Sequence, residues 1–351
     1  MLKKRYLDKN KKKAKVKSKE TVLIIYFWVV SVALAYYSPY SLPSTTSLGD
    51  AVTANSGDLS SILHNPAVIS RINHYGIELM LSDLYGLDFD VISIAYNNPL
   101  AKGNLGIFIG LISSSDMPVT DVYRYSRSGG QTDNGIVLDA SDKPSILGYY
   151  KENRSLIFIT YSLSILRYLD IGISIKRHSH SFGGDLISDR YINAMIHSKA
   201  NGLGFDFGVI YNFKNIDIGI ALVDILNTNL DWNTEYEYTE KLPERFIFGI
   251  KGKFLDIKLL TEIEKRSDFD KIIIGCGAEY NLLKYFNLRC GYNSESLLST
   301  GIGIDYDISK VISFLGIAGD KKNYISINYS ISLLSAIGLT HKISLIYKIG
   351  N

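Results

Sequence analysis

Apolar and small or polar side chains alternate along most of the chain beyond about residue 89, and this period of two constrains the fold more than any other feature. Clear examples are the segments 216–224, 301–308 and 341–350, where Ile, Leu or Tyr stands at every second position. Successive side chains of a β-strand point to opposite faces of a sheet, so the alternation predicts strands. About fourteen to sixteen segments of roughly ten residues show it. We therefore expect an all-β fold.

The residues on the two faces distinguish a membrane barrel from a soluble sandwich, which also alternates. The face between the aliphatic residues is rich in Gly, Ser, Asn and Asp. Tyrosines stand on the apolar face near the ends of several strands: Tyr96, Tyr211, Tyr280, Tyr292, Tyr306 and Tyr347. An aliphatic band with aromatic borders and a polar interior is typical of membrane barrels. We predict a transmembrane antiparallel β-barrel of about 14 strands over residues 75–351, with the sandwich as the alternative.

Connections of two lengths join the predicted strands. Long connections are expected at 114–144, 181–201 and 227–244, and tight turns at Lys214-Asn215, Leu255-Asp256 and Ser309-Lys310. Long loops at one end and short turns at the other are typical of membrane barrels. The sequence leaves open which end faces outward.

Residues 1–35 have the layout of a secretory signal peptide. The first twenty residues contain ten Lys or Arg and two acidic residues, and an apolar run of 15 residues, 21–35, follows. The run ends in the small-x-small step Ala33-Leu34-Ala35, which is typical of a cleavage site. It is shorter than the roughly 20 residues that a spanning helix needs. We expect cleavage after Ala35 and export to the bacterial outer membrane, with a retained membrane anchor as the alternative.

The formal net charge of +3 comes from this leader. Without the first twenty residues, 28 basic residues stand against 33 acidic ones, a net charge of −5. A basic surface for nucleic acid is therefore not expected. The partner that the sequence predicts is outer-membrane lipid.

A short segment before the first strand breaks the pattern. In "SILHNPAVIS", residues 61–70, Pro66 removes a backbone donor and disfavours helical geometry at Asn65. A short helix should therefore end at about His64, followed by a turn at Asn65-Pro66-Ala67. We expect residues 36–74 to form a separate N-terminal segment.

Several stretches together resemble the PorV/PorQ family of outer-membrane proteins, which is related to the FadL fatty-acid transporters. They are Gly49-Asp50-Ala51, the Asn65-Pro66-Ala67 motif, "EKLPERFIFGIKGKF" (240–254), "GCGAEYNLLKYFNLRCGYN" (275–293) and "IGLTHKISLIYKIG" (337–350). Lys342 stands where the family usually has Arg. The resemblance covers residues 49–350.

The resemblance implies that residues 36–74 plug the barrel lumen, with Asn65, Pro66 and Ala67 in the plug; a helix packed on the rim is the alternative. It also implies passage of hydrophobic or amphipathic small molecules across the outer membrane. Two alternatives remain: a carrier or accessory component of protein export related to type IX secretion, with a secreted protein as partner, and a structural surface barrel. A lumen with apolar residues facing the plug would favour the first function.

No catalytic constellation, cofactor motif or metal site is predicted, so we do not expect an enzyme. His178 and His180 share one strand face but lack a third ligand at a useful spacing. Gly202-Leu203-Gly204 and Gly301-Ile302-Gly303 lie in strand patterns without a following helix, so they are not phosphate loops. Cys276 and Cys290 fall on the apolar faces of two neighbouring strands; free thiols facing lipid are the simpler interpretation, and a disulfide is the alternative.

Overall fold

A computed structural model describes residues 39–84, 89–100, 102–114, 116–121, 131–132, 135–136, 145–186, 197–233, 238–283, 285–295, 297–309, 322–334 and 338–350. The predicted leader, residues 1–35, lies outside these ranges. The chain divides into two compact units. The larger unit comprises Tyr40–Met117, Tyr150–Gly184 and Asp189–Asn351, and the smaller comprises Met1–Pro39, Pro118–Tyr149 and Asp185–Ser188.

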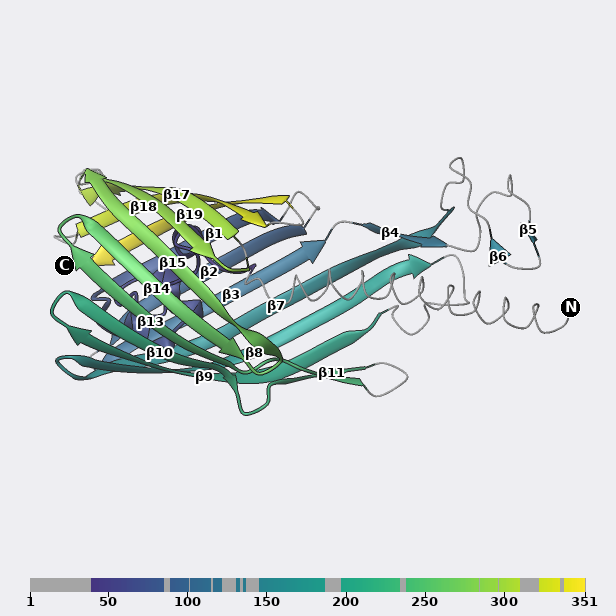
Figure 1. Ribbon diagram of the computed structural model, residues 1–351, viewed down its shortest axis with the longest axis horizontal. Helices are drawn as coiled ribbons and strands as arrows, with labels where there is room; N and C mark the ends of the chain where they lie inside the picture. Colours follow the sequence, from purple (N-terminus) through teal and green to yellow (C-terminus); the bar gives the residue numbers. More distant parts are fainter. Residues whose placement is uncertain are drawn as a thin grey trace, which may run out of the picture. The chain divides into compact units, whose positions relative to one another are not determined.

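Fourteen antiparallel strands pair in a closed ring (Figure 1). In order around the ring they are β1 (His74–Leu84), β2 (Phe89–Leu100), β3 (Gly103–Ser114), β7 (Ser145–Leu166), β8 (Leu169–Leu186), β9 (Lys199–Phe213), β10 (Ile216–Ile225), β13 (Arg245–Phe254), β14 (Ile257–Arg266), β15 (Phe269–Leu283), β16 (Phe286–Asn293), β17 (Leu297–Asp307), β18 (Lys322–Leu334) and β19 (Gly338–Gly350). The ring closes where β1 pairs with β19, His74 opposite Gly350. The predicted fold class and strand number are confirmed.

The remaining short strands lie in the connections. They are β4 (Met117–Asp121), the hairpin of β5 (Gln131–Thr132) and β6 (Gly135–Ile136), and the hairpin of β11 (Asn229–Trp232) and β12 (Tyr238–Lys241). The long connection expected at 227–244 therefore contains a hairpin. Its first strand also pairs with β9, Trp232 opposite Ala200.

The two ends of the barrel carry different connections. We call the end where β1 begins and β19 ends the terminal rim, and the opposite end the loop rim. The tight turns expected at Lys214-Asn215 and Leu255-Asp256 are confirmed, and both lie at the terminal rim. The loop rim carries the connections at 115–144, 187–198 and 226–244.

Two expected connections are wrong in their bounds. The turn at Ser309-Lys310 is not a tight one, because Asp307 pairs with Tyr324 and the two strands are joined by 308–321. The connection expected at 181–201 is shorter, because the alternating ladder between β8 and β9 continues to the pair Ser181 and Lys199. In both cases the cross-strand register sets the ends of the strands.

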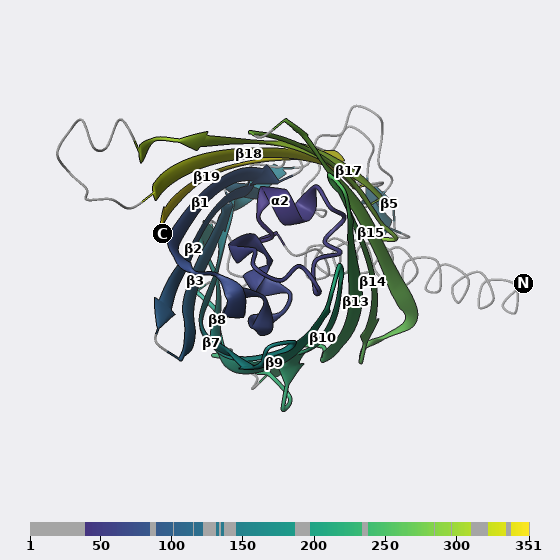
Figure 2. The same ribbon diagram turned by 90° about the vertical axis from the view of Figure 1, so that its left-hand side faces the viewer.

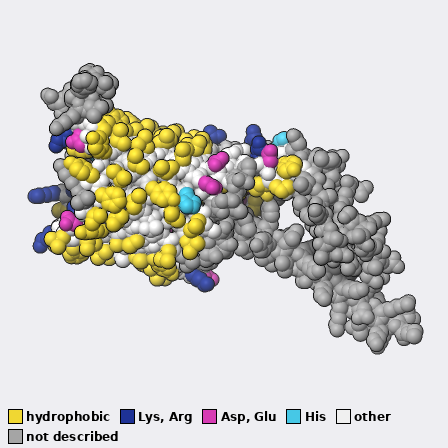
Figure 3. Space-filling view, turned by 90° about the horizontal axis from the view of Figure 1, so that it is seen from above, with side chains coloured by type: hydrophobic (Ala, Val, Ile, Leu, Met, Phe, Trp, Pro, Cys, Tyr) yellow, Lys and Arg dark blue, Asp and Glu magenta, His cyan; other side chains and the backbone are white. Residues whose placement is uncertain are grey.

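Every second strand residue faces outward, as the alternation predicts. Ile304 is 45% exposed and Leu345 is 48% exposed, whereas Ser344 is 2% exposed and faces the interior. Figure 3 shows hydrophobic side chains covering the outer face of the strands. Tyr211, Tyr280, Tyr292 and Tyr306 are exposed on the same face. A band of this kind matches the hydrocarbon region of a bilayer.

Among the described residues, no helix reaches the length and hydropathy needed to cross a membrane. The helical turns of this part of the chain are four to six residues long.

Ile304→Arg places a charge in the outward apolar band, and we expect it to destabilise the barrel by about 2–4 kcal/mol if the site lies near the bilayer midplane. The measurement is urea unfolding of the protein in phosphatidylcholine vesicles. Ile304→Val keeps the surface apolar and should change little. An equally mild effect of both substitutions would mean that this face does not contact lipid.

Candidate functional site: the segment inside the barrel

Residues 40–73, which we call the luminal segment, lie inside the ring of strands (Figure 2). The segment contains the helical turn α2 (Pro43–Thr46) and two 3-10 turns, η1 (Leu59–Leu63) and η2 (Pro66–Arg71). Nearly all of it is buried: Leu42, Val52, Asn65 and Ala67 are each 0% exposed. The first barrel strand, β1, begins directly after the luminal segment, at His74.

The luminal segment runs from the loop-rim half of the barrel to the terminal rim. At its start, Lys342 Nζ donates to the Ser41 carbonyl oxygen at 2.7 Å. Lys342 pairs with Ser82, two residues before the loop-rim end of β1. At the other end, Arg71 Nε donates to Asp170 Oδ2 at 2.6 Å, beside the terminal-rim turn between β7 and β8. The segment is therefore fixed at both ends.

Local side-chain caps explain the two 3-10 turns. Asp58 accepts a hydrogen bond from the Ser60 amide at the start of η1. Asn65 Oδ1 accepts one from the Ala67 amide at 2.9 Å at the start of η2, and Pro66 is the first residue of that turn. Asn and Asp are preferred at such positions because they satisfy amides that lack a partner. The turn expected at Asn65-Pro66-Ala67 is present, and η1 ends at Leu63 with His64 as its capping residue, next to the expected end.

Asn65 also joins the luminal segment to the barrel wall. Its Nδ2 donates to the Thr53 carbonyl at 2.8 Å within the segment. The same group lies 3.3 Å from the Val209 carbonyl and 3.4 Å from the Ile220 carbonyl, on neighbouring strands β9 and β10. One amide side chain therefore connects two parts of the segment to two strands.

Glycine makes this close approach possible. A Cβ atom on Gly208 would clash with Asn65 Oδ1 and would lie 2.9 Å from Pro66 Cδ. On β8, a Cβ on Gly172 would lie 2.6 Å from the Ala67 nitrogen. Real Cβ atoms do not approach so closely, so the wall needs glycine where the Asn65-Pro66-Ala67 turn packs.

Two buried glutamates of the wall accept hydrogen bonds from the luminal segment. Glu78 on β1 accepts from Ser60 Oγ at 2.6 Å and from Ser344 Oγ of β19 at 2.7 Å. Glu262 on β14 accepts from the Thr53 amide at 2.9 Å. Irregular backbone needs partners when it is buried, and these carboxylates supply them. The sequence analysis missed both residues, although Glu78 stands at an inward position between the exposed Ile77 and Leu79.

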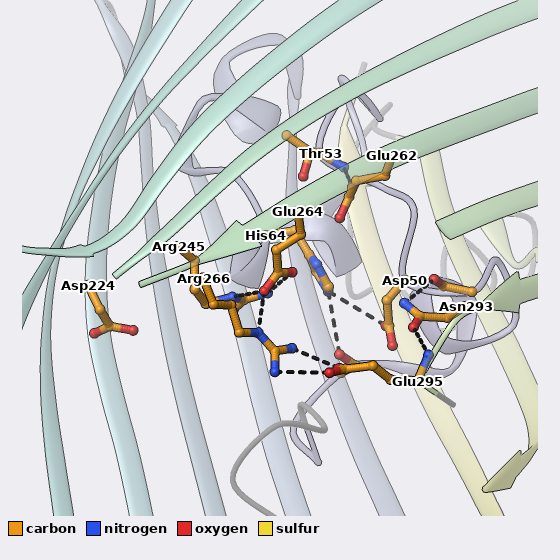
Figure 4. A network of polar contacts seen from close by, with 12 residues as sticks. Asp50, Thr53, His64, Asp224, Arg245, Glu262, Glu264, Arg266, Asn293 and Glu295 are labelled. Carbon is orange, nitrogen blue, oxygen red and sulfur yellow. Dashed lines mark hydrogen bonds and ion pairs between the residues drawn. The ribbon is translucent and has the colours of Figure 1, made fainter. Parts of the chain in front are cut away.

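A charged network lies between the luminal segment and the loop rim (Figure 4). Arg245 donates through Nε and Nη2 to the two oxygens of Glu264, both at 2.7 Å. Arg266 Nε donates to Glu264 Oε1 at 2.6 Å, and its Nη2 donates to Glu295 Oε2 at 2.9 Å. Asn293 continues the network to the segment, because its Nδ2 donates to the Gly49 carbonyl at 3.2 Å.

His64 stands within the luminal segment and is 3% exposed. Its Nε2 lies 3.7 Å from Asp50 Oδ1 and 3.4 Å from Ser41 Oγ. Burial lowers the pKa of His64, an effect that the Asp50 carboxylate opposes and that Arg245 and Lys342 reinforce. Glu264 also acts against the lowering. The imidazole is therefore held in its neutral form.

The two histidines considered as metal ligands each have a carboxylate partner instead. His180 Nε2 lies 2.7 Å from Glu152 Oε1, and His178 Nε2 lies 3.4 Å from Asp224 Oδ1. The described residues contain no group of three or more His, Cys, Asp or Glu side chains placed to hold a metal ion. Cys276 and Cys290 are both free and exposed, so the described structure favours free thiols over a disulfide.

An apolar patch interrupts the polar lumen. Phe108 of β3 stacks on Phe158 of β7 with ring centroids 5.1 Å apart, and Tyr40 of the luminal segment meets Phe108 edge-on at 6.4 Å. Phe108 is 0% exposed and Phe158 is 3% exposed. Burial raises the pKa of the Tyr40 hydroxyl. The patch is therefore covered by the start of the segment.

The family described as type IX secretion system membrane protein PorP/SprF matches residues 147–347. The fold is similar to the toluene transporter TbuX of Ralstonia pickettii (12% identity, TM-score 0.54, 89% of this chain and 99% of that one). It is also similar to the toluene transporter TodX of Pseudomonas putida (12% identity, TM-score 0.53, 87% of this chain and 96% of that one). A Pseudomonas aeruginosa FadL homologue is similar too (10% identity, TM-score 0.57, 90% of this chain and 99% of that one).

Likeness at these identities shows the fold alone, and no curated protein matches the sequence. The expected barrel fold is confirmed, and with the membrane-protein family that matches, so is the place in the bacterial outer membrane. The resemblance to the PorV/PorQ family is not confirmed, because the family that matches is PorP/SprF.

Gly208→Val places a branched side chain against Asn65 and should displace the Asn65-Pro66-Ala67 turn from the wall. We expect faster cleavage of the luminal segment by a soluble protease in detergent, while the barrel keeps its heat-modifiable gel mobility. Ala221→Val, at a buried position on the neighbouring strand, tests whether added volume alone has this effect. Equal cleavage of wild type and Gly208→Val would contradict the packing described.

Acid should loosen the luminal segment through His64. Because the packed histidine has a lowered pKa, the released segment binds a proton more readily, so packing loses stability as the pH falls through about 6.5. Protease cleavage of the segment should therefore be faster at pH 5 than at pH 8. His64→Gln stays uncharged and should reduce this pH dependence; an unchanged dependence would assign it to other groups.

Proposed function

The chain belongs to the PorP/SprF family of type IX secretion system membrane proteins, and from this premise we propose that it is an outer-membrane component of a protein-export apparatus. In this role the barrel is a membrane-embedded body with a closed lumen, and the luminal segment is its plug. Export of folded or unfolded polypeptides then takes place beside this barrel or through its partners. The role needs no catalytic chemistry.

The observation that carries the proposal is the way the luminal segment is held. Wall side chains bind it at Ser41, Thr53 and Ser60, and an ion pair binds it at Arg71. Each contact uses a buried group whose loss would leave a polar atom without a partner. A segment bound in this way along its whole length supports a stable closure.

The polar lumen also bears on the competing function. Wall residues that bind the segment include Glu78, Glu262 and Lys342, all buried and polar. An apolar surface around the plug would favour passage of hydrophobic molecules, and the wall instead combines these polar groups with apolar contacts such as that of Leu260 with Leu48 and Val52. The polar contacts therefore support the export role over a hydrocarbon channel.

Passage of hydrophobic or amphipathic small molecules is the second candidate. The specific observation in its favour is the apolar patch of Tyr40, Phe108 and Phe158. TbuX and TodX, which share the fold, are toluene transporters. This evidence is weaker than that for export, because Tyr40 covers the patch and a shared fold does not identify a substrate.

We expect cells lacking this protein to retain secreted cargo of the type IX system in the periplasm. A wild-type copy should restore export, and so should Phe108→Ala/Phe158→Ala, which removes the apolar patch but no polar contact to the segment. The measurement is the fraction of cargo in the culture medium. Normal export without the protein would refute the export role, and slower uptake of a hydrophobic compound by the double variant would favour the second candidate.

Closure is tested separately in planar bilayers. Asn65→Ala removes the cap and the wall contacts of η2, a loss of about 1 kcal/mol for the cap, and Pro66→Ala frees its backbone. Both variants should show larger or more frequent conductance steps than wild type, and deletion of residues 36–70 should increase them further. A deletion that conducts no better than the intact protein would show that the segment does not act as a plug.

A further inference from the structure

A cluster of aromatic side chains lies on the inward face of the wall near the loop rim. It consists of His180 and Phe182 of β8 and Trp232 of β11, and we call it the aromatic cluster. The rings of Phe182 and Trp232 stack with centroids 5.6 Å apart and an interplanar angle of 19°. The His180 ring meets that of Phe182 at 4.6 Å and that of Trp232 at 5.0 Å. Both strands extend toward the loop rim (Figure 1).

The strand register brings these rings together. β9 lies between β8 and β11, and its residue Ala200 stands opposite both His180 and Trp232. Residues that stand directly opposite share a face of the sheet, and Ala200 is 0% exposed, so this face is the inward one. The small alanine side chain leaves room for the two flanking rings to meet. Tyr238 of β12 stands opposite Trp232 on the same face and is 52% exposed.

Carboxylates hold the polar edges of two of the rings. His180 Nε2 lies 2.7 Å from Glu152 Oε1, and Glu152 also pairs with Arg154. Trp232 Nε1 donates to Glu240 Oε2 at 3.2 Å. Glu240 forms no ion pair within the described part of the chain, and its side chain is partly exposed. The aromatic cluster therefore stands beside a carboxylate whose charge no neighbouring cation balances.

The neighbouring charges on β8 add to this negative excess. Lys176, on the same face as His180, contacts Asp206 at 2.8 Å and Asp224 at 2.9 Å, so one ammonium group stands against two carboxylates. The face of an aromatic ring also carries partial negative charge. Rings and unbalanced carboxylates at one place favour a cation over a neutral or anionic ligand.

We propose that the aromatic cluster and Glu240 bind the guanidinium group of arginine near the loop rim. A guanidinium group is planar, stacks on aromatic rings and donates to a carboxylate in a fixed fork. Phe182 and Trp232 are partly exposed and offer the rings, and Glu240 offers the acceptor. A neutral sugar would also stack on such rings, but it has no charge to match Glu240. The inference goes beyond the export role and does not depend on it, because free guanidinium compounds and arginine side chains of polypeptides carry the same group.

The fluorescence of Trp232 itself can report binding. The chain has two tryptophans, and Trp28→Phe leaves Trp232 as the only one. This protein is titrated in detergent with N-acetylarginine amide while its fluorescence is measured. N-acetylcitrulline amide has nearly the same shape without the charge and is the matched probe, and maltose tests the neutral sugar. A short peptide with a single arginine is the probe for a polypeptide ligand.

Two substitutions in the same background locate the site. Glu240→Gln removes the charge and keeps an oxygen that can accept from Trp232 Nε1. Asp231→Asn removes a charge from the same hairpin but at an exposed position on the opposite face, so it is the control. Phe182→Leu removes one ring of the stack. Heat-modifiable gel mobility shows whether each variant forms the barrel.

We expect the arginine amide to change the fluorescence saturably and the citrulline amide to leave it unchanged. Glu240→Gln should weaken the apparent affinity about fivefold, Phe182→Leu should also weaken it, and Asp231→Asn should not. High salt should weaken binding, because the pair is partly exposed. Tighter binding of the peptide than of the amide would assign the site to polypeptides, and equal affinity would assign it to free guanidinium compounds.

Equal responses to the two amides would overturn the proposal, and so would equal losses in Glu240→Gln and Asp231→Asn. A response to maltose alone would show a sugar site instead. Should a variant not give a heat-modifiable barrel, the comparison of the two amides on the Trp28→Phe protein still decides between these outcomes.

Discussion

A barrel of fourteen strands encloses more space than its own inward side chains fill, and the irregular backbone placed there has to exchange water for protein partners. That exchange is visible along the luminal segment. Carbonyl oxygens of Ser41, Gly49 and Ser70 accept hydrogen bonds from Lys342, Asn293 and Asn104. Polar side chains of the wall thus satisfy the backbone of the segment, as a neighbouring strand satisfies the backbone of a strand in a sheet.

The charges of the lumen follow from the same constraint. A buried arginine is tolerated only with a carboxylate in good geometry, and Arg245 has both oxygens of Glu264. Lys176 is shared by Asp206 at 2.8 Å and Asp224 at 2.9 Å, which leaves one negative charge on the group. Removing one member of such a group leaves the other charges buried without a partner, which destabilises the fold. The contributions of these residues to stability are therefore not independent.

How far the sequence predicted the structure depends on the range of the interaction. The strands and their outward faces were predictable because lipid on one side imposes a period of two over long stretches. The turn at Asn65-Pro66-Ala67 was predictable because Pro66 and the Asn65 cap act within three residues. The contacts of Glu78 and Glu262 were not, because only the strand register decides which inward residue meets Ser60 or Thr53. The expected tight turn at Ser309-Lys310 failed for the same reason, since the pairing of Asp307 with Tyr324 is nonlocal.

The direction of the luminal segment has a consequence for biogenesis. The segment begins in the loop-rim half and leaves at the terminal rim, where His74 enters the wall beside Gly350, the last residue of β19. Entry of the segment into a finished ring would draw its polar backbone past the buried charges of the lumen. Placement of the segment while the sheet is still open avoids this step, so we expect the seam between β1 and β19 to close last, around a segment that is already in place.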